Sequence, residues 1–333
     1  MNFGKINSVI IMGGGMLVSN FAIELKKNNF EVMVVTSPRQ VFEDKKFHNV
    51  LKDNNISFLI SENISTESKV IEKITNNTLG ISVGASWILK KEFIEKFNGK
   101  LLNIHGARLP RDRGGGNFSW LALQSKRLGY CLIHKLDQGI DTGEIVKISE
   151  FYYPPECRIP IQYKEYYLQQ NENFLKEFIG EIKEEKDFDT IKQPEYLSTY
   201  WPRLSTEHNG LINWNWNLKQ IEQFICAFDE PYMGASTFID DKKVFVKNCM
   251  ISTDDGIFHP YQKGLIYRKT TEAFFVATED GSLIIKKIVD EKGNDMVEEL
   301  KVGDRLFTSI EHLEKAQKFR PIYTSKGLKE NPE

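Results

Sequence analysis

The chain has 333 residues, which is too long for one ordinary hydrophobic core and fits two domains. Hydrophobic residues make up 41% and charged residues 27%, a composition typical of globular proteins that fold in water. The formal net charge is −2, so composition does not favour a nucleic-acid-binding surface, and no apolar run reaches the ~18 residues of a membrane-spanning helix. The four cysteines are widely spaced. They predict buried thiols in a reducing compartment, the cytoplasm, and neither a zinc site nor a disulfide framework.

The N-terminal half alternates short apolar runs with helical patterns, which predicts a parallel sheet joined by crossover helices. The predicted strands are Val9–Met12, Glu31–Val35, Ile56–Ile60, Leu79–Val83 and Leu101–Ile104, and the predicted helices are Leu17–Asn28, Thr66–Asn76 and Glu92–Phe97. A hairpin of Gly129–Leu136 with Glu144–Ile148 follows, and then a helix over Gln162–Glu185. Ligands of open α/β sheets bind at the carboxyl ends of strands, which is where the fifth strand brings Asn103 and His105.

The C-terminal part has a different pattern. An irregular stretch, Phe188–Glu207, separates it from the first half. One helix is predicted over Leu218–Ala227, followed by the strands Ala235–Ile239, Lys243–Val246, Ala273–Ala277 and Ser282–Val289. Turn residues between these short strands indicate a small barrel or sandwich.

Three polar residues stand out because they lie at glycine-flanked turns within fifty positions: Asn103, His105 and Asp141. An amide can hold a developing oxyanion, and an imidazole, with a pKa of about 6.5, can accept a proton at neutral pH. A carboxylate can orient that imidazole and stabilise its charged form. Each residue also has a simpler interpretation: a structural histidine, an asparagine at a strand end, and an ordinary turn aspartate.

The glycine clusters are weaker signals. Gly13–Gly15 follow the first strand but lack the spaced glycines of a dinucleotide fingerprint, and no acidic residue ends the second strand. Gly114–Gly116, beside Arg111 and Arg113, are compatible with a phosphate-binding loop, a mobile lid or a plain loop.

Three motifs in order resemble the folate-dependent formyltransferases, a family that includes methionyl-tRNA formyltransferase and the sugar N-formyltransferases. The family has an N-x-H strand end, an L-P-x-x-R-G loop and a G-x-D-T-G turn, which correspond here to Asn103–His105, Leu109–Gly114 and Gly139–Gly143. Further matching segments are Tyr200–Arg203, Gly210–Trp214 and Ala227–Ala235, with Cys226 where the family usually has arginine.

The resemblance implies a Rossmann-like, parallel-sheet catalytic domain over residues 1–195 and a smaller β-rich domain, an OB-like barrel, over residues 205–325. It implies transfer of a formyl group from N10-formyltetrahydrofolate to a primary amine, without a metal. Asn103 and His105 would donate hydrogen bonds to the oxyanion or relay its proton, while Asp141 would hold the imidazole.

The same resemblance suggests which residues bind the two substrates. The folate would lie against two segments that contribute Ser86, Trp87, Ile88, Leu89, Asp137, Gly139 and Ile140. The acceptor would be contacted by Arg111, Arg113, Gly115, Trp201, Phe228 and Tyr232.

The charge balance bears on the acceptor. The chain has 44 Lys and Arg against 46 Asp and Glu, and its glycine-rich loop is short for a clamp on tRNA. We therefore expect a nucleotide-linked amino sugar, a 4-amino-4,6-dideoxyhexose, in bacterial surface-glycan biosynthesis such as that of O-antigen and lipopolysaccharide. Neither nucleic acid nor a membrane is an expected partner, and a homodimer remains open. Two alternatives stay open: a methionyl-tRNA formyltransferase and a non-catalytic nucleotide-binding regulatory module.

Overall fold

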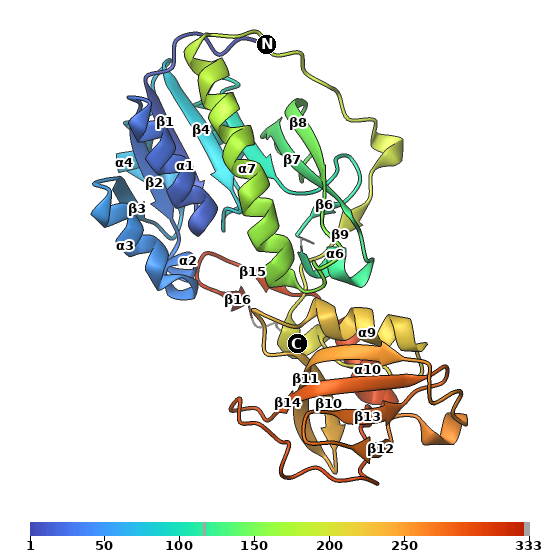
Figure 1. The fold of residues 1–333 in the computed structure, drawn as a ribbon. Coiled ribbons are helices and arrows are strands. Elements are labelled where there is room, and N and C mark those ends of the chain that lie inside the picture. Colours follow the sequence, from blue (N-terminus) through green and yellow to red (C-terminus); the bar gives the residue numbers. More distant parts are fainter. Residues whose placement is uncertain (116–117, 330–333) are drawn as a thin grey trace.

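The fold is known from a computed structural model, which describes residues 1–115 and 118–329 (Figure 1). Gly116, counted above with the glycine-rich loop, lies outside the described residues.

The N-terminal half forms a seven-stranded sheet in the order β3-β2-β1-β4-β5-β7-β8. Its strands are β1 (Ser8–Gly13), β2 (Glu31–Thr36), β3 (Ser57–Ile60), β4 (Thr78–Val83), β5 (Leu101–His105), β7 (Leu128–Lys135) and β8 (Ile145–Tyr152).

The first five strands are parallel, and β7 and β8 are antiparallel additions that form the predicted hairpin. The associated helices are α1 (Met16–Lys27), α2 (Pro38–Glu43), α3 (Lys45–Asp53), η1 (Ile64–Thr66), α4 (Ser68–Ile71), α5 (Lys91–Glu95), α6 (Phe118–Leu123) and α7 (Pro160–Lys183). The α/β class expected from the alternating pattern is confirmed.

Alternation along β1 places side chains on both faces of this sheet. Val9 and Ile11 pack with α1 and α7 on one face. Ile10 and Met12 pack on the other face with residues of α4 and α5. Because both faces are covered by helices, the strand is apolar throughout, as parallel strands usually are.

The helix predicted over Thr66–Asn76 is wrong in length, since α4 has only four residues. The Thr78 hydroxyl accepts a hydrogen bond from the Thr75 backbone N–H at 3.0 Å and donates one to the Lys73 carbonyl at 3.1 Å. These side-chain contacts favour a turn and compete with helical backbone bonding, so the chain turns into β4.

A short linker carries the chain to the second sheet. It contains η2 (Glu195–Leu197), β9 (Tyr200–Trp201), which pairs with β6 (Arg113–Gly114), and α8 (Thr206–Asn209). The C-terminal elements are α9 (Leu218–Ala227), β10 (Ala235–Ile239), β11 (Lys242–Ser252), η3 (Pro260–Gln262), β12 (Ile266–Lys269), β13 (Phe274–Ala277), β14 (Ser282–Val289), α10 (Ile310–Lys318), β15 (Ile322–Tyr323) and β16 (Leu328–Lys329).

The five strands β10-β11-β14-β13-β12 form an antiparallel sheet. Residues 305–307 join its two edges, because Phe307 bridges to Phe238 in β10 and Arg305 bridges to Leu265, just before β12. This closure gives the sheet a barrel-like form, in agreement with the expected β-rich domain. One apolar cluster runs from this sheet through α9 to α6 and α7, so the two halves share a core.

The last hairpin, β15–β16, returns to the N-terminal half and lies between α2 and the C-terminal sheet (Figure 1). The backbone N–H of Arg39 in α2 donates to the Ser325 carbonyl at 3.0 Å. Among the helices of the described residues, none is long and apolar enough to cross a membrane.

Candidate active site

Two neighbouring antiparallel strands bring three polar side chains together. Asn103 and His105 are two residues apart in β5, so their side chains leave the same face of the sheet. Asn103 lies directly opposite His134 of β7. His134 is only 2% exposed, and it was missed by the sequence reasoning because its role depends on this cross-strand pairing.

A fourth side chain, Asp141, comes from the loop after β7. Its backbone has φ +53°, a left-handed conformation that aspartate tolerates better than most residues. The Gln193 amide donates to the carbonyl oxygens of Asp141 and Gly143, at 2.8 and 2.6 Å. At Gly143 a Cβ would lie 1.9 Å from the Lys135 carbonyl oxygen, so this turn requires glycine. The loop is therefore held in one shape by the Gln193 side chain and by the close approach of Gly143 to Lys135.

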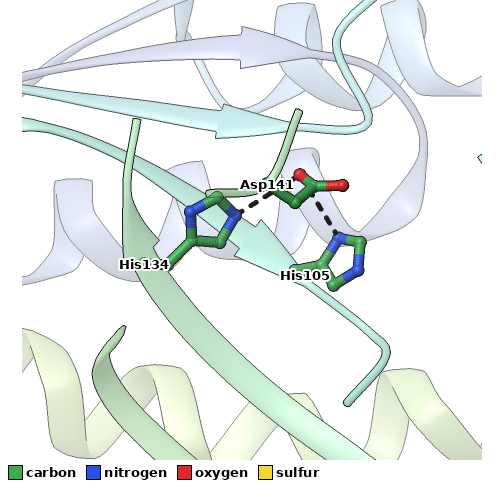
Figure 2. Close-up of side chains that lie close together, drawn as sticks. All are labelled: His105, His134 and Asp141. Atoms are coloured by element: carbon green, nitrogen blue, oxygen red, sulfur yellow. Dashed lines mark ion pairs between the residues drawn. The ribbon is translucent and has the colours of Figure 1, made fainter. Parts of the chain in front are cut away.

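Figure 2 shows the two imidazoles on either side of the Asp141 carboxylate. Oδ1 of Asp141 lies 3.8 Å from Nδ1 of His105 and 3.5 Å from Nε2 of His134. The Asn103 amide nitrogen lies 3.1 Å from the same His134 nitrogen and 3.5 Å from Oδ1 of Asp141. Backbone N–H of Gly114 donates to the other carboxylate oxygen at 2.9 Å.

These distances assign the hydrogens of His134. Its Nδ1 lies 2.7 Å from the Lys135 carbonyl oxygen, which can only accept, so Nδ1 carries a hydrogen. In the neutral ring Nε2 then accepts from the Asn103 amide, which fixes the orientation of that amide. The two amide hydrogens of Asn103 consequently point to His134 and Asp141, so neither is free to bind a substrate in this arrangement.

Burial sets the protonation of His105. Its pKa is lowered, chiefly because burial penalises the charged ring, although the Asp141 carboxylate opposes this effect. Burial alone would raise the pKa of Asp141, but His134 and His105 in their charged forms, together with the Gly114 N–H, hold it well below its usual range. An ionised Asp141 favours the hydrogen on Nδ1 of His105. Nε2 of His105, buried and without a hydrogen-bond partner among the described residues, then carries a lone pair ready to accept a proton.

The same three residues also have the spacing of a metal-ligand cluster, since the candidate ligand atoms of His105, His134 and Asp141 lie within 4.8 Å of one another. In the neutral form of His134 inferred above, the Nε2 lone pair already accepts the Asn103 amide hydrogen. The set therefore suits proton transfer better than it suits metal binding.

The predicted folate-contacting residues fall on two loops. Trp87 and Leu89 follow β4, and they pack against the same apolar cluster as Leu136, which precedes Asp137. Ile88 is 98% exposed and Ile140 is 59% exposed, so both loops present an apolar side chain to solvent. The other predicted members are engaged locally: the Ser86 hydroxyl accepts from Ser37, and the Asp137 carboxylate accepts from Gly139 and Thr142.

The predicted acceptor-contacting residues are not all brought to an open surface. Arg113 is 6% exposed, and its guanidinium donates to Glu195, at 2.8 Å, and to Gln193. It therefore stabilises the position of Gln193, whose amide donates to the Asp141 carbonyl. Phe228 is 2% exposed and belongs to the shared core. Neither side chain is free to contact a substrate in this structure, because each is occupied by packing or an ion pair.

The remaining members of that set lie at the surface or beside it. Arg111 is exposed and Tyr232 is 39% exposed. Trp201 packs on Trp120 with ring centroids 4.8 Å apart and donates to Asp112. The N–H of Gly115 donates to the carbonyl oxygen of Trp201 at 3.0 Å.

Comparison with known proteins identifies the family. Residues 6–154 match the formyl transferase family, and residues 204–301 match the formyl transferase C-terminal domain. The chain belongs to the formyl transferase family. The segments that carried the resemblance in the sequence lie within these matches, except Tyr200–Arg203, which falls between them.

Relatives within this family include methionyl-tRNA formyltransferases. The one from Ruminiclostridium cellulolyticum is 26% identical over 204 residues, which cover 60% of this chain and 63% of that protein. The one from Geobacter metallireducens is 27% identical over 217 residues, 64% of this chain and 66% of that protein. The matched segment thus spans slightly under two thirds of the length of both relatives.

Solved structures of this formyl transferase fold include sugar-modifying enzymes. The sugar 3N-formyl transferase WlaRD, crystallised with dTDP and 5-N-formyl-THF, superposes with a TM-score of 0.62 at 21% identity, covering 85% of this chain and 98% of that one. An N-formyltransferase from Helicobacter canadensis, in complex with folinic acid and dTDP-3-aminofucose, superposes with a TM-score of 0.61 at 21% identity, covering 84% and 98%. These likenesses establish the shared fold.

Proposed function

We propose that this protein transfers a formyl group from N10-formyltetrahydrofolate to the amine of a nucleotide-linked amino-deoxy sugar. The observation that carries the proposal is the buried Nε2 of His105, a proton acceptor that no described residue occupies, beside an ionised Asp141. Acyl transfer to an amine needs such a group, because the attacking nitrogen must lose a proton. Membership of the formyl transferase family supplies the group transferred.

Each residue of the site then has a distinct role. The folate supplies a formyl group on a nitrogen leaving group, and the sugar supplies an uncharged amine. Nε2 of His105 would accept the proton that the attacking amine loses. The imidazolium would then donate this proton to the departing folate nitrogen. Asp141 would stabilise the imidazolium formed meanwhile.

Asn103 would act as the hydrogen-bond donor to the oxyanion. Its contact with Asp141, at 3.5 Å, is longer than the contact with His134, at 3.1 Å. One amide hydrogen can therefore leave Asp141 while the His134 contact keeps the amide oriented. A donor of this kind typically contributes about 2.7–4 kcal/mol to the transition state.

The fit of a folate rests on the two loops beside this site. Trp87 and Leu89 share an apolar cluster with Leu136, and Ile88 and Ile140, on the same two loops, are exposed to solvent. A flat pterin ring is accommodated by apolar side chains with a few polar groups between them. Structures of WlaRD and of the Helicobacter canadensis protein, which contain formylated folates, support the same co-substrate here.

A nucleotide-linked sugar is supported by two observations. The chain covers 98% of both sugar N-formyltransferases, which were crystallised with dTDP or a dTDP-sugar. Its net charge of −2 offers no general attraction for RNA. A 4-amino-4,6-dideoxyhexose and a place in O-antigen or lipopolysaccharide synthesis are the finer form of the proposal.

The alternative acceptor is the amino group of methionyl-tRNA, favoured by the relatives with which the chain shares 26–27% identity.

Purified protein should be incubated with N10-formyltetrahydrofolate and either a panel of nucleotide-linked 3- and 4-amino sugars or initiator methionyl-tRNA. Mass spectrometry would detect formylated product, and absorbance would follow the folate. Product with a sugar and none with tRNA supports the proposal; formylated tRNA alone supports the alternative. No folate turnover with any amine, while His105→Ala and wild type behave alike, would rule out both.

A further inference from the structure

A buried arginine outside the reacting residues lacks a full set of partners. Arg39 in α2 is 8% exposed, yet its Nε has no hydrogen-bond acceptor among the described residues. One Nη donates to the Ser86 hydroxyl at 3.0 Å, and the carboxylate of Glu43 approaches Nε only to 3.6 Å. Glu43 is mainly exposed, so solvent screens this pairing. A buried guanidinium with an unused donor is costly unless an acceptor reaches it.

A second arginine lies beside the first. Arg203, in the linker between the two sheets, and Arg39 both approach the ring of Tyr323, with guanidinium carbons 5.3 Å (Arg39) and 5.7 Å (Arg203) from its centroid. Arg203 has no hydrogen-bond acceptor in the part of the chain that the structure describes. Its pKa is lowered, first by burial and then by the positive charge of Arg39. The two like charges therefore repel each other in a partly buried place.

This arginine pair adjoins the candidate active site. Ser86, which receives the Arg39 hydrogen bond, follows β4, the strand next to β5. On the other side the Arg203 side chain lies against Gly115, where a Cβ would come within 1.9 Å of its Cγ. The preceding residue, Gly114, donates to Asp141. Both arginines thus contact residues that adjoin elements of the candidate site, where a group attached to the acceptor would bind.

The C-terminal hairpin covers this place. Tyr323 is in β15, the Ser325 carbonyl accepts from the Arg39 backbone, and Lys326 pairs with Glu62 at 2.8 Å. Figure 1 shows the hairpin beside α2 at the junction of the two sheets. The hairpin supplies an aromatic ring to the two guanidinium groups, which is a weak substitute for an anion.

We propose that Arg39 and Arg203 form an anion subsite, under the C-terminal hairpin, that binds the diphosphate of the acceptor. A diphosphate has two charged groups and many acceptor oxygens, and arginine recognises such groups through paired N–H donors. The identity of the ligand as a nucleotide diphosphate rests on the function proposed above. The existence of the anion subsite does not.

The test measures binding of inorganic pyrophosphate to the full-length protein by calorimetry, without any formyl donor. Arg39→Met and Arg203→Met should each weaken binding at least ~10-fold, the expected effect of losing a charged hydrogen bond. Arg268→Met is the matched control: this arginine pairs with Asp255 in the C-terminal part and should leave pyrophosphate binding unchanged. Equal binding by wild type and both test variants would overturn the proposal, as would absence of pyrophosphate binding to a wild type that still binds 5-formyltetrahydrofolate.

A further variant covers the case in which Arg39→Met fails to fold. Gly115→Ala keeps both charges and only displaces Arg203, so weaker pyrophosphate binding with unchanged 5-formyltetrahydrofolate binding would support the subsite. Unchanged pyrophosphate binding in both Gly115→Ala and Arg203→Met would contradict it. If pyrophosphate binding depends on the arginines but no amine is formylated, the subsite stands and the proposed function fails.

Discussion

Gly114 donates its backbone N–H to Oδ2 of Asp141 at 2.9 Å, which ties the glycine-rich loop to the acid of the candidate site. Gly114 has φ +96°, and a Cβ there would lie 2.4 Å from the Tyr200 ring and 2.7 Å from the Trp201 carbonyl oxygen. Glycine is required at this position for both reasons. The contact also explains how the linker, through β9, helps to orient a carboxylate in the first half of the chain.

Replacement of His105 by Gln should lower kcat by about 10²–10⁴, the usual contribution of a general base. The low pKa of His105, caused mainly by burial, keeps the ring neutral at pH 7. The wild-type pH profile of kcat, which follows groups in the enzyme–substrate complex and not the free amine, should therefore be flat around neutrality and fall only below about pH 6.5. Folate absorbance at a series of pH values measures this. An acid limb centred above pH 7 would contradict the assignment.

Replacement of Asp141 by Asn should reduce both turnover and stability. Its folded-state pKa is depressed, so the carboxylate stabilises the fold above the unfolded pKa of about 3.9, and this contribution is lost as the pH falls through the folded value. The difference in unfolding free energy between wild type and Asp141→Asn should thus be largest at neutral pH and shrink below about pH 4. Urea unfolding from pH 7 to pH 2.5 measures it. Asp254→Asn, on an exposed turn, should show no such trend.

His134 should act as a positioning residue through Asn103. His134→Phe removes the acceptor for the Asn103 amide, so the amide loses the hydrogen bond that orients it. The loss of one such hydrogen bond should lower kcat by about tenfold or more. His134→Gln offers a side-chain oxygen to the same amide and should restore part of the rate. The KM for folate should change little in both variants. Equal kcat in the Phe and Gln variants would show that His134 only fills space.

Gly180 offers a stability test remote from the site. It lies inside α7, and a Cβ there would have no other atom within 4 Å. Gly180→Ala should raise the free energy of unfolding by about 0.5–1 kcal/mol, because alanine loses less backbone entropy in a helix. At Gly129 the Cβ would come within 2.4 Å of the Phe151 ring, so Gly129→Ala should destabilise the fold. Thermal unfolding of both variants would show shifts of opposite sign.

Several elements with a clear period were predictable from the sequence, although β11 spans Lys242–Ser252 and was predicted only over Lys243–Val246. Strand β14, strand β10 and helix α9 begin and end where the pattern placed them. Short elements were not: α2 and α3 were not anticipated, and α4 is far shorter than its pattern suggested. A short element contains too few residues for a clear periodic pattern. Side-chain hydrogen bonds, such as those of Thr78, then decide where a helix ends.

The local sequence determined which chemical groups this protein offers: a strand ending in Asn103 and His105, a turn that needs glycine around Asp141, and two domains of different pattern. Only the tertiary structure decided what these groups contact. The pairing of β5 with β7 placed His134 against Asn103, and packing turned Arg113 and Phe228 away from any open site. The return of the last hairpin placed Tyr323 beside Arg39 and Arg203. Such contacts join residues far apart in the chain, so the periodic pattern of a single segment cannot predict them. The protonation and the role of these side chains depend on their burial and on the geometry of their partners.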